Sequence, residues 1–424
     1  MIVHLAYGKT GIDVEIPDAN LQSVLTMRDV PAVANPARAL TQLLGSPMGG
    51  AALADRARHA ASACIVVCDI TRPVPNRILL PPILAALGEG GIQRERITIL
   101  VATGLHRPST QDELLAMLGD EIVRTTRIVN HRARVKDEQR SLGTTRQGTP
   151  VCIDEEYCAA DLKVTTGFIE PHLMAGFSGG RKLIAPGCAG EETIKALHSP
   201  QFIEHPMCRE GSIEGNPLHE ELLTIARMAG HDMIVNVALD AERRITGVFA
   251  GDPEEAHARG VSHVRSAATA TVPSPVDMVI TSSAGHPLDL TLYQAVKGMT
   301  AAVPILKPGG TLIIAAECAE GLGSPEFTAM ATASTTARGF LDELRRVPVR
   351  IDQWQLEECA KVAVGHECVL VSSGIPEDQR RRLFIRTAPT LDDAVREGIR
   401  RHGSGARIAV IPKGPYTLVR LQSP

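Results

Sequence analysis

The sequence predicts an α/β protein with two α/β domains, mainly parallel sheets and an active-site cleft between the domains. Short runs of aliphatic and β-branched residues alternate with amphipathic stretches, which is typical of parallel strands covered by helices on both faces. These runs form two series, separated by a proline-bearing segment at 271–275 that breaks both periodicities. A length of 424 residues is enough for two or three cores. We therefore expect an N-terminal domain of residues 1–270 and a C-terminal domain of residues 276–424.

The N-terminal series contains apolar runs that end in polar or glycine-rich turns, as buried parallel strands do. The predicted strands are 64–70, 97–104 and 162–167. Amphipathic stretches at 76–87 and 110–118 predict helices between them. Ser109 or Thr110 can cap the second helix, with Glu113 as the carboxylate of a capping box.

The C-terminal series repeats the pattern. Its predicted strands are 277–282, 310–316, 368–373 and 407–412. The segment from Ser282 to Gly298 is predicted to be a strand end, a turn and then a helix. Together the two series favour a cleft between two sheets.

Composition excludes several classes of function. The net charge is −4, and the only basic run is Arg380 to Arg382, so neither nucleic acid nor a membrane surface is an expected partner. Aromatic residues make up only 3% of the chain, which disfavours base-stacking platforms. The N-terminus does not resemble a signal peptide, and no apolar run could span a bilayer, so we expect a cytoplasmic protein. Nine cysteines without a C-x-x-C pair favour reduced thiols.

Charged side chains follow each of the first three predicted strands. Asp69 and Arg72 follow the first, His106 the second and His172 the third. Ligands of open α/β sheets bind outside the carboxyl ends of the strands, so these residues indicate a site for an anion. Taken singly they have ordinary alternatives: Asp69 could cap a helix, and a lone histidine is more often structural.

A glycine-rich segment at 174–182 is the second candidate. Ser178, Gly179 and Gly180 would let backbone N–H groups approach a phosphate, and Lys182 adds a charge. The spacing matches neither a P-loop nor a dinucleotide fingerprint, and a simple tight turn explains the glycines equally well. His198, at the end of a predicted helix, is either a metal ligand or a residue stabilised by the helix dipole.

The C-terminal domain contributes Tyr293, Gln294 and Lys297. Tyr293 and Lys297 are one helical turn apart, so one face offers a hydroxyl, an amide and an ammonium group. A solvated helix surface is the alternative. A tyrosine in a chain so poor in aromatic residues favours a functional role.

In order and spacing, these motifs resemble those of the nickel-pincer-nucleotide-dependent lactate racemase family, over nearly the whole chain. The resemblance implies a cofactor that is a pyridinium-3-thioamide-5-thiocarboxylate mononucleotide nickel complex. In some family members a lysine matching Lys182 forms a thioamide with this cofactor, and His198 matches the nickel ligand. His106 and His172 match the paired acid/base histidines.

The remaining residues follow from the same resemblance. Arg72 and Lys297 match contacts to the substrate carboxylate and oxygen, with Tyr293 and Gln294 beside them. Trp354 matches a pocket tryptophan. The expected cofactor-binding set is completed by Asp69, Ser178, Gly179 and Gly180. Residues 1–270 would then bind the cofactor and carry the catalytic groups, and residues 276–424 would complete the substrate site.

The implied chemistry is physically coherent. The α-hydrogen of a 2-hydroxycarboxylate is a very weak acid, whereas removal of hydride to the cofactor gives a planar 2-keto acid. Return of hydride to the opposite face inverts the centre, and two histidines provide one base for each hand. The expected activity is racemisation of short-chain, lactate-like 2-hydroxyacids, with a small 2-hydroxycarboxylate as substrate and cofactor-biosynthesis proteins as transient partners.

Other activities stay open at this point. A malate racemase or a sugar-acid C2 epimerase would use the same site residues to act on a 2-hydroxyacid with a different side chain. A cofactor carrier or maturation protein would need Lys182 and the glycine loop but not two bases. A nicotinamide-dependent dehydrogenase is disfavoured because the dinucleotide glycine pattern is missing.

Overall fold

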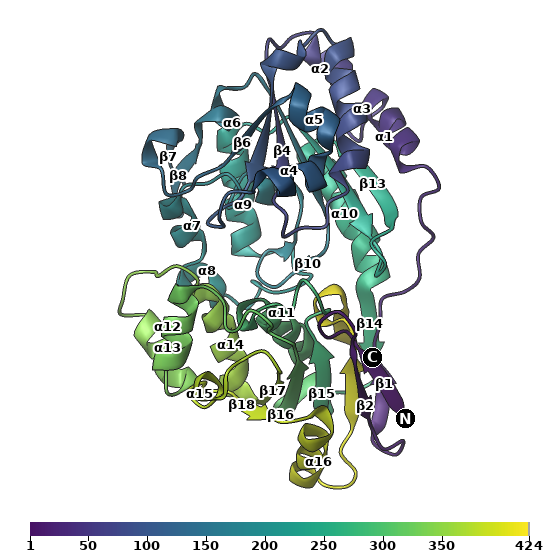
Figure 1. Cartoon of the computed structure of the whole chain (residues 1–424), viewed down its shortest axis with the longest axis vertical. Helices are drawn as coiled ribbons and strands as arrows, with labels where there is room; N and C mark the ends of the chain where they lie inside the picture. The colour runs from purple at the N-terminus through teal and green to yellow at the C-terminus, as the bar shows by residue number, and fades with distance from the viewer. Residues whose placement is uncertain (423–424) are drawn as a thin grey trace.

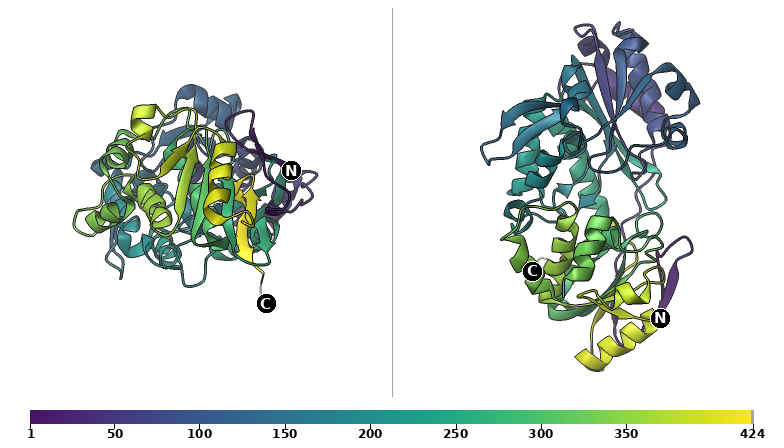
Figure 2. Two further views of the ribbon diagram at one scale, coloured as in Figure 1. Left: turned by 90° about the horizontal axis from the view of Figure 1, so that it is seen from below. Right: turned by 60° about the vertical axis from the view of Figure 1, so that its left-hand side comes forward.

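A computed structural model describes residues 1–422 of the chain. They form two six-stranded sheets, which lie one beyond the other along the long axis of the molecule (Figure 1). The blue and teal half of the figure contains the first sheet, and the green and yellow half contains the second. Both termini lie at the second half, as the turned views also show (Figure 2). The predicted α/β fold with two mainly parallel sheets is confirmed.

The first sheet is parallel except at one edge. Its strands are Ala63–Cys68 (β4), Ile97–Ala102 (β5), Arg127–Asn130 (β6), Leu162–Phe168 (β9), Met233–Leu239 (β12) and Ile245–Gly251 (β13). Their order is β13-β12-β9-β4-β5-β6, and only β12 and β13 are antiparallel. Strands β5 and β9 lie on either side of β4, so the carboxyl ends of the three predicted strands meet at one edge.

Helices cover both faces of this sheet, which is why its central strands are apolar without interruption. They are Pro36–Gly45 (α1), Leu53–Ala57 (α2), Asn76–Glu89 (α3), Gln111–Leu118 (α4), Asp120–Thr125 (α5), Glu155–Ala159 (α6), Glu191–Leu197 (α7), Pro200–Ile203 (α8), Pro217–Ala229 (α9) and Pro253–Ala268 (α10). On β4, Ile65 packs against the core of α1 to α5, and Val66 packs against the core of α6, α7 and α9. Thr110 caps α4, with Glu113 completing the predicted capping box.

The second sheet is parallel throughout. Its strands are Leu21–Val24 (β3), Val276–Ser282 (β15), Leu306–Ala315 (β16), Glu367–Val371 (β17), Arg386–Ala388 (β18) and Ile408–Ile411 (β19), in the order β18-β17-β16-β15-β19-β3. The helices of this half are Leu292–Ala302 (α11), Pro325–Ala333 (α12), Ala337–Leu344 (α13), Gln353–Gly365 (α14), Glu377–Arg380 (α15) and Leu391–His402 (α16). Helices α11 to α14 pack on one face, and α16 packs on the other beside a hairpin of Ile2–Leu5 (β1) and Ile12–Glu15 (β2).

Shorter elements complete the chain. They are the strands Gln139–Thr144 (β7), Pro150–Asp154 (β8), Pro171–His172 (β10), Gly176–Phe177 (β11), Thr269–Val272 (β14) and Leu418–Leu421 (β20), and the 3₁₀ turns Arg94–Arg96 (η1), Lys136–Glu138 (η2), Gly180–Leu183 (η3), Val303–Ile305 (η4) and Gly414–Tyr416 (η5). Among residues 1–422, no helix has the length and apolar character needed to cross a membrane.

The N-terminal segment departs from the predicted domain boundaries. The sequence predicts that residues 1–270 form one domain, whereas β3 pairs with β19 and the β1-β2 hairpin packs on the second sheet. The segment predicted as a linker, 271–275, also differs, because its first two residues belong to β14, which pairs with β20. Both differences depend on pairings with residues more than a hundred positions away, which local patterns cannot reveal.

Gly176 occupies a position that excludes a side chain. Its φ of 77° is in the left-handed region, and a Cβ atom there would lie 1.9 Å from the carbonyl oxygen of Ser212. We expect Gly176→Ala to lower the free energy of unfolding by more than about 3 kcal/mol, because a backbone clash adds to the conformational cost. Gly148→Ala is the matched control, since Gly148 has a φ of 90° with no atom within 4 Å of a Cβ. Equal losses in urea unfolding would contradict the clash.

Glu357 is a buried carboxylate on α14. It has no exposed surface, and neither of its oxygens has a hydrogen-bond partner. Burial, together with the neighbouring charge of Glu358, raises its pKa to about 8. Because this pKa lies above that of the unfolded chain, the protonated acid stabilises the fold at low pH, and this contribution is lost as the pH rises through 8.

We therefore expect Glu357→Gln to be more stable than the parent at pH 9 by about 1–3 kcal/mol, the cost of an unpaired buried polar group. At pH 5 the two proteins should unfold alike. Denaturant unfolding at both values measures this, with Glu89→Gln as a control at an exposed carboxylate. A gain that is the same at pH 5 and pH 9 would contradict the assignment.

Candidate active site

A cavity of about 200 Å³ lies between the two halves of the molecule. The first half contributes the carboxyl ends of β4, β5 and β9 together with η3 and α7, and the second half contributes α11 and α14. Twelve of the predicted site residues line it: Asp69, Arg72, His106, His172, Ser178, Gly179, Lys182, His198, Tyr293, Gln294, Lys297 and Trp354. Strand ends, a 3₁₀ turn and the ends of three helices thus bring residues from distant parts of the sequence to one place.

His106 is held by a carboxylate. Its Nδ1 lies 2.7 Å from Oδ2 of Asp69, whose other oxygen accepts hydrogen bonds from the Thr71 hydroxyl at 2.6 Å and the Thr71 N–H at 3.2 Å. Burial alone would raise the pKa of Asp69, but these hydrogen bonds and the charge of His106 lower it below its usual value. An ionised Asp69 fixes the proton on Nδ1 of His106, so Nε2 presents a lone pair.

His172 is held in the opposite way. Its Nδ1 accepts the backbone N–H groups of Met174 and Ala175, each at 3.2 Å. Burial, followed by the charges of Lys182 and Lys297, holds the pKa of His172 well below the ordinary histidine value. A neutral imidazole whose Nδ1 accepts must carry its proton on Nε2. One histidine of the cavity therefore presents a proton acceptor at Nε2, and the other presents a hydrogen-bond donor at Nε2.

Two cations suited to an anionic ligand face the cavity. Within residues 1–422 the Arg72 side chain hydrogen-bonds only to Thr71, which leaves most of its guanidinium N–H groups available. The Lys297 ammonium donates to Oε1 of Gln294 at 2.6 Å, which is the contact that their spacing on one helix predicts. Burial and the charge of Arg72 lower the pKa of Lys297.

Lys182 and His198 are buried in the same cavity. Burial, followed by the charges of Arg181 and Arg72, lowers the pKa of Lys182 to about 7, so a large share of its amine is neutral near neutral pH. Burial lowers the pKa of His198 to about 4. Its Nδ1 donates to the Ile194 carbonyl at 2.8 Å, which leaves Nε2 as a free lone pair. This is the arrangement of a histidine prepared to bind a metal.

Trp354 and Tyr293 close the cavity from the second half. The Trp354 indole packs against His198, with ring centroids 4.4 Å apart and planes inclined by 35°. Its Nε1 donates to the Tyr293 hydroxyl at 2.9 Å. The only tryptophan of the chain therefore contacts a residue of the opposite half.

The glycine-rich loop at 174–182 offers fewer free backbone N–H groups to a phosphate than the sequence predicts. Gly180 does not line the cavity. Its N–H donates to Oδ1 of Asn236 at 2.8 Å and is therefore unavailable to a phosphate. The Ser178 N–H donates to the Glu170 carbonyl, and its hydroxyl donates to the Phe168 carbonyl. The inclusion of Gly180 in the cofactor site is corrected accordingly.

Asp352 belongs to the cavity although no sequence pattern predicts it. It lines the cavity from the start of α14, where it has a φ of 64° and accepts a hydrogen bond from the Ser324 hydroxyl at 2.6 Å. Burial raises its pKa. A left-handed aspartate at a helix start leaves no signal in local sequence patterns, so only the folded chain reveals it.

Comparison with known proteins agrees with this geometry. The family model of the lactate racemase N-terminal domain matches residues 7–211, and that of the lactate racemase C-terminal domain matches residues 271–419. A lactate racemase from Thermoanaerobacterium thermosaccharolyticum is 34% identical over 99% of both chains. The chain belongs to the lactate racemase family. It is accordingly an enzyme of the isomerase class, as predicted.

Other members of the lactate racemase family and solved structures extend the comparison. A lactate racemase from Lactiplantibacillus plantarum is 36% identical over 99% of both chains. The solved lactate racemase apoprotein of T. thermosaccharolyticum has a TM-score of 0.94 and covers 99% of this chain and 100% of its own. A Thermotoga maritima protein, 16% identical, has a TM-score of 0.68 over 91% of this chain and 97% of its own, which shows a shared fold.

Proposed function

We propose that the chain interconverts the D and L forms of short-chain, lactate-like 2-hydroxyacids. The observation that carries this proposal is the pair of histidines in opposite tautomers, His106 and His172, in one cavity with Arg72 and Lys297. A carrier of a cofactor would need no such pair. The names of the relatives from T. thermosaccharolyticum and L. plantarum support the same activity.

The donors in the cavity fit a nickel-pincer nucleotide. His198 has a free Nε2 beside the buried amine of Lys182, so it can supply one metal ligand while the other ligands come from a bound small molecule. Lys182 has the neutral amine that an amide-type bond to such a molecule requires. When bound, the nickel-pincer nucleotide supplies an acceptor and donor of hydride.

The residues of the chain then have separate tasks. The Arg72 fork binds the substrate carboxylate, and Lys297 stabilises the substrate oxygen. Nε2 of His106 accepts the hydroxyl proton as the alcohol becomes a 2-keto acid, and the same nitrogen returns that proton when the alcohol is formed again. The neutral His172 meanwhile donates a hydrogen bond from its Nε2–H to the substrate oxygen and keeps its proton. For a substrate of the opposite hand His172 takes the part of the base, which requires its tautomer with the proton on Nδ1 and a free Nε2, so both hands are served.

The charges of the cavity favour a substrate with one carboxylate. The Arg72 and Lys297 cations are already assigned to one carboxylate and one hydroxyl oxygen. Malate or a sugar acid would need further polar partners. We therefore rank lactate-like acids first. The cytoplasmic location and the transient contact with cofactor-biosynthesis proteins remain predictions.

The direct test uses protein produced together with the cofactor-making enzymes and shown to contain nickel. Each enantiomer of lactate, malate and 2-hydroxybutyrate is supplied alone, and the opposite enantiomer is quantified by chiral chromatography. We expect inversion of lactate to be fastest. Failure to invert any 2-hydroxyacid by nickel-loaded protein would overturn the proposal, and faster inversion of malate would reassign the substrate.

The pKa of Lys297 makes substrate binding dependent on pH. Because burial and Arg72 lower this pKa, the ammonium loses its charge at a lower pH than an ordinary lysine does, and the KM for the anionic substrate should rise as the pH increases from 7 to 10. Lys297→Arg keeps its charge throughout, so its KM should vary less over this range. Identical KM profiles for the two proteins would contradict this role.

A further inference from the structure

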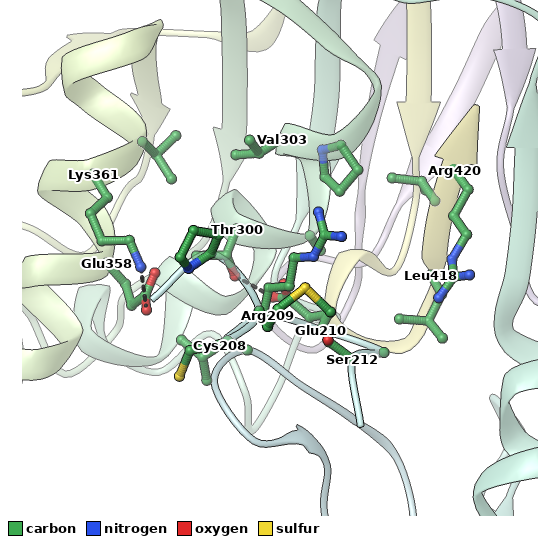
Figure 3. Close-up of a pocket in the computed structure, with 18 of the residues that line it drawn as sticks. Cys208, Arg209, Glu210, Ser212, Thr300, Val303, Glu358, Lys361, Leu418 and Arg420 are labelled. Carbon is green, nitrogen blue, oxygen red and sulfur yellow. Dashed lines mark hydrogen bonds and ion pairs between the residues drawn. The ribbon is translucent and has the colours of Figure 1, made fainter. Parts of the chain in front are cut away.

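A second and larger cavity lies at the junction of the two halves. Its volume is about 680 Å³, and its walls are the loop at 204–214, α10, α11, η4, α14 and β20. Figure 3 shows this cavity, with Glu358 and Lys361 at one end and Ser212, Leu418 and Arg420 at the other. The activity proposed above uses none of these residues.

The cavity is separate from the candidate active site. Helix α11 divides the two, because Gln294 and Lys297 line the smaller cavity while Thr300 and Ala301 line the larger. Leu173, which follows His172, lines both. A molecule in the larger cavity would thus lie behind the wall of the smaller one.

Guanidinium groups gather at one end of the larger cavity. The Nη2 of Arg265 donates to the Gly211 carbonyl at 3.3 Å. The Nη2 of Arg420 also lies beside Gly211, since it would be 3.1 Å from a Cβ atom added to this glycine. Arg209 is two positions earlier in the same loop and lines the same cavity. Burial and the charges of Arg265 and Arg209 lower the pKa of Arg420, as expected for three cations brought together.

Little negative charge balances this cluster. Within residues 1–422, Arg209 and Arg420 form no ion pair, and Arg265 has only Glu214, at 3.7 Å and with 83% of its side chain exposed. The other three acids that line the cavity have other partners: Glu204 pairs with Arg345 at 3.2 Å, Glu210 accepts from Thr300 at 2.5 Å and Glu358 accepts from Lys361 at 3.0 Å. The arginine end is therefore positively charged.

A buried donor in this cavity has no partner. Ser212 is only 8% exposed and follows Gly211, yet its hydroxyl forms no hydrogen bond. The Nε of Arg265 is likewise buried and unpaired. Buried polar groups are nearly always satisfied, so two donors without a protein partner beside the arginine end of the cavity are unusual.

We propose that Arg209, Ser212, Arg265 and Arg420 bind the phosphate group of a small phosphorylated metabolite. Three guanidinium groups and a hydroxyl suit a dianion with several acceptor oxygens. The rest of the cavity, with apolar walls from Met207, Val303 and Leu418, has room for an organic remainder. Since Arg209 and Arg265 belong to the first half and Arg420 follows the second sheet, the ligand links the two halves.

The test uses the full-length chain without added cofactor and inorganic phosphate as the probe. Phosphate is titrated by calorimetry at constant ionic strength in an Arg72→Gln background, which weakens anion binding in the smaller cavity. We expect saturable binding. Arg209→Gln and Arg420→Gln should each weaken it at least about tenfold, as the loss of one charge-assisted hydrogen bond predicts. Arg38→Gln, at an exposed arginine remote from both cavities, should leave it unchanged.

Three results would overturn the proposal. One is the absence of saturable phosphate binding, and another is binding that Arg209→Gln and Arg420→Gln both retain. The third is binding of succinate in place of phosphate, which would assign the site to dicarboxylates. Melting temperatures of the variants without phosphate show whether each is folded. Because no step requires turnover, the result is independent of the racemase activity.

Discussion

Replacement of His106 by alanine is expected to reduce the rate of racemisation by about 10²- to 10⁴-fold, the usual contribution of a positioned general base. The geometry gives the reason: Asp69 holds the proton of His106 on Nδ1, so Nε2 is free to accept the proton of the substrate hydroxyl. His172→Ala should have an effect of the same size, because a racemase needs the partner group for the other hand. Folding should change little, since 45% of the His106 side chain is exposed.

The two histidine variants should differ in what they still do. With one enantiomer at a time and a single turnover, each variant should form the 2-keto acid from one hand of the substrate and not from the other. Chromatography of the acid-quenched reaction measures this. Asp69→Asn is the matched positioning variant, and it should lower kcat with little change in KM, because an amide can no longer anchor the His106 tautomer through a charge. Full turnover in both alanine variants would exclude the acid/base assignment.

The sequence predicts that the strand-end residues of the candidate site lie together, because of a simple property of parallel sheets. Asp69, His106 and His172 each follow a strand, and adjacent parallel strands end at the same edge, so local patterns were sufficient to bring them together. The contact between Gln294 and Lys297 was likewise predictable, because it depends only on helical spacing.

Other features depend on contacts between distant parts of the chain. Gly180 is of the residue type that phosphate-binding loops use, but its backbone N–H donates to the Asn236 side chain on a neighbouring strand. The sequence assigns strand β3 to the first domain, whereas its pairing with β19 places it in the second sheet. The approach of Arg265 and Arg420 to Gly211 cannot be predicted from local patterns either. Arg265 lies on a helix, Arg420 on a strand and Gly211 in a loop, in three separate regions of the sequence.

His198→Ala is expected to lower the nickel content of cofactor-loaded protein by at least about tenfold, since even the loss of an outer-shell partner costs that much in metal affinity. The Ile194 carbonyl directs the free Nε2 of His198 into the cavity, and the low pKa of about 4 keeps that nitrogen unprotonated under all ordinary conditions. Elemental analysis of protein produced together with the cofactor-making enzymes measures the effect. His59→Ala is the control, because His59 is exposed and outside both cavities.

In the same preparation, Lys182→Ala shows whether the cofactor is held by a covalent bond to the chain or by coordination of its nickel alone. If the amine of Lys182 forms the covalent bond, intact-mass spectrometry of the parent should show an adduct that Lys182→Ala lacks, while His198 still holds part of the nickel. The pKa of about 7 makes the bond-forming step faster at pH 8 than at pH 6, because only the neutral amine is a nucleophile. Lys195→Ala, in the last turn of helix α7, controls for the loss of a lysine. An adduct that persists in Lys182→Ala would show that the cofactor is bound through another residue, whereas nickel without an adduct in the parent would mean that coordination and the surrounding cavity suffice to retain it.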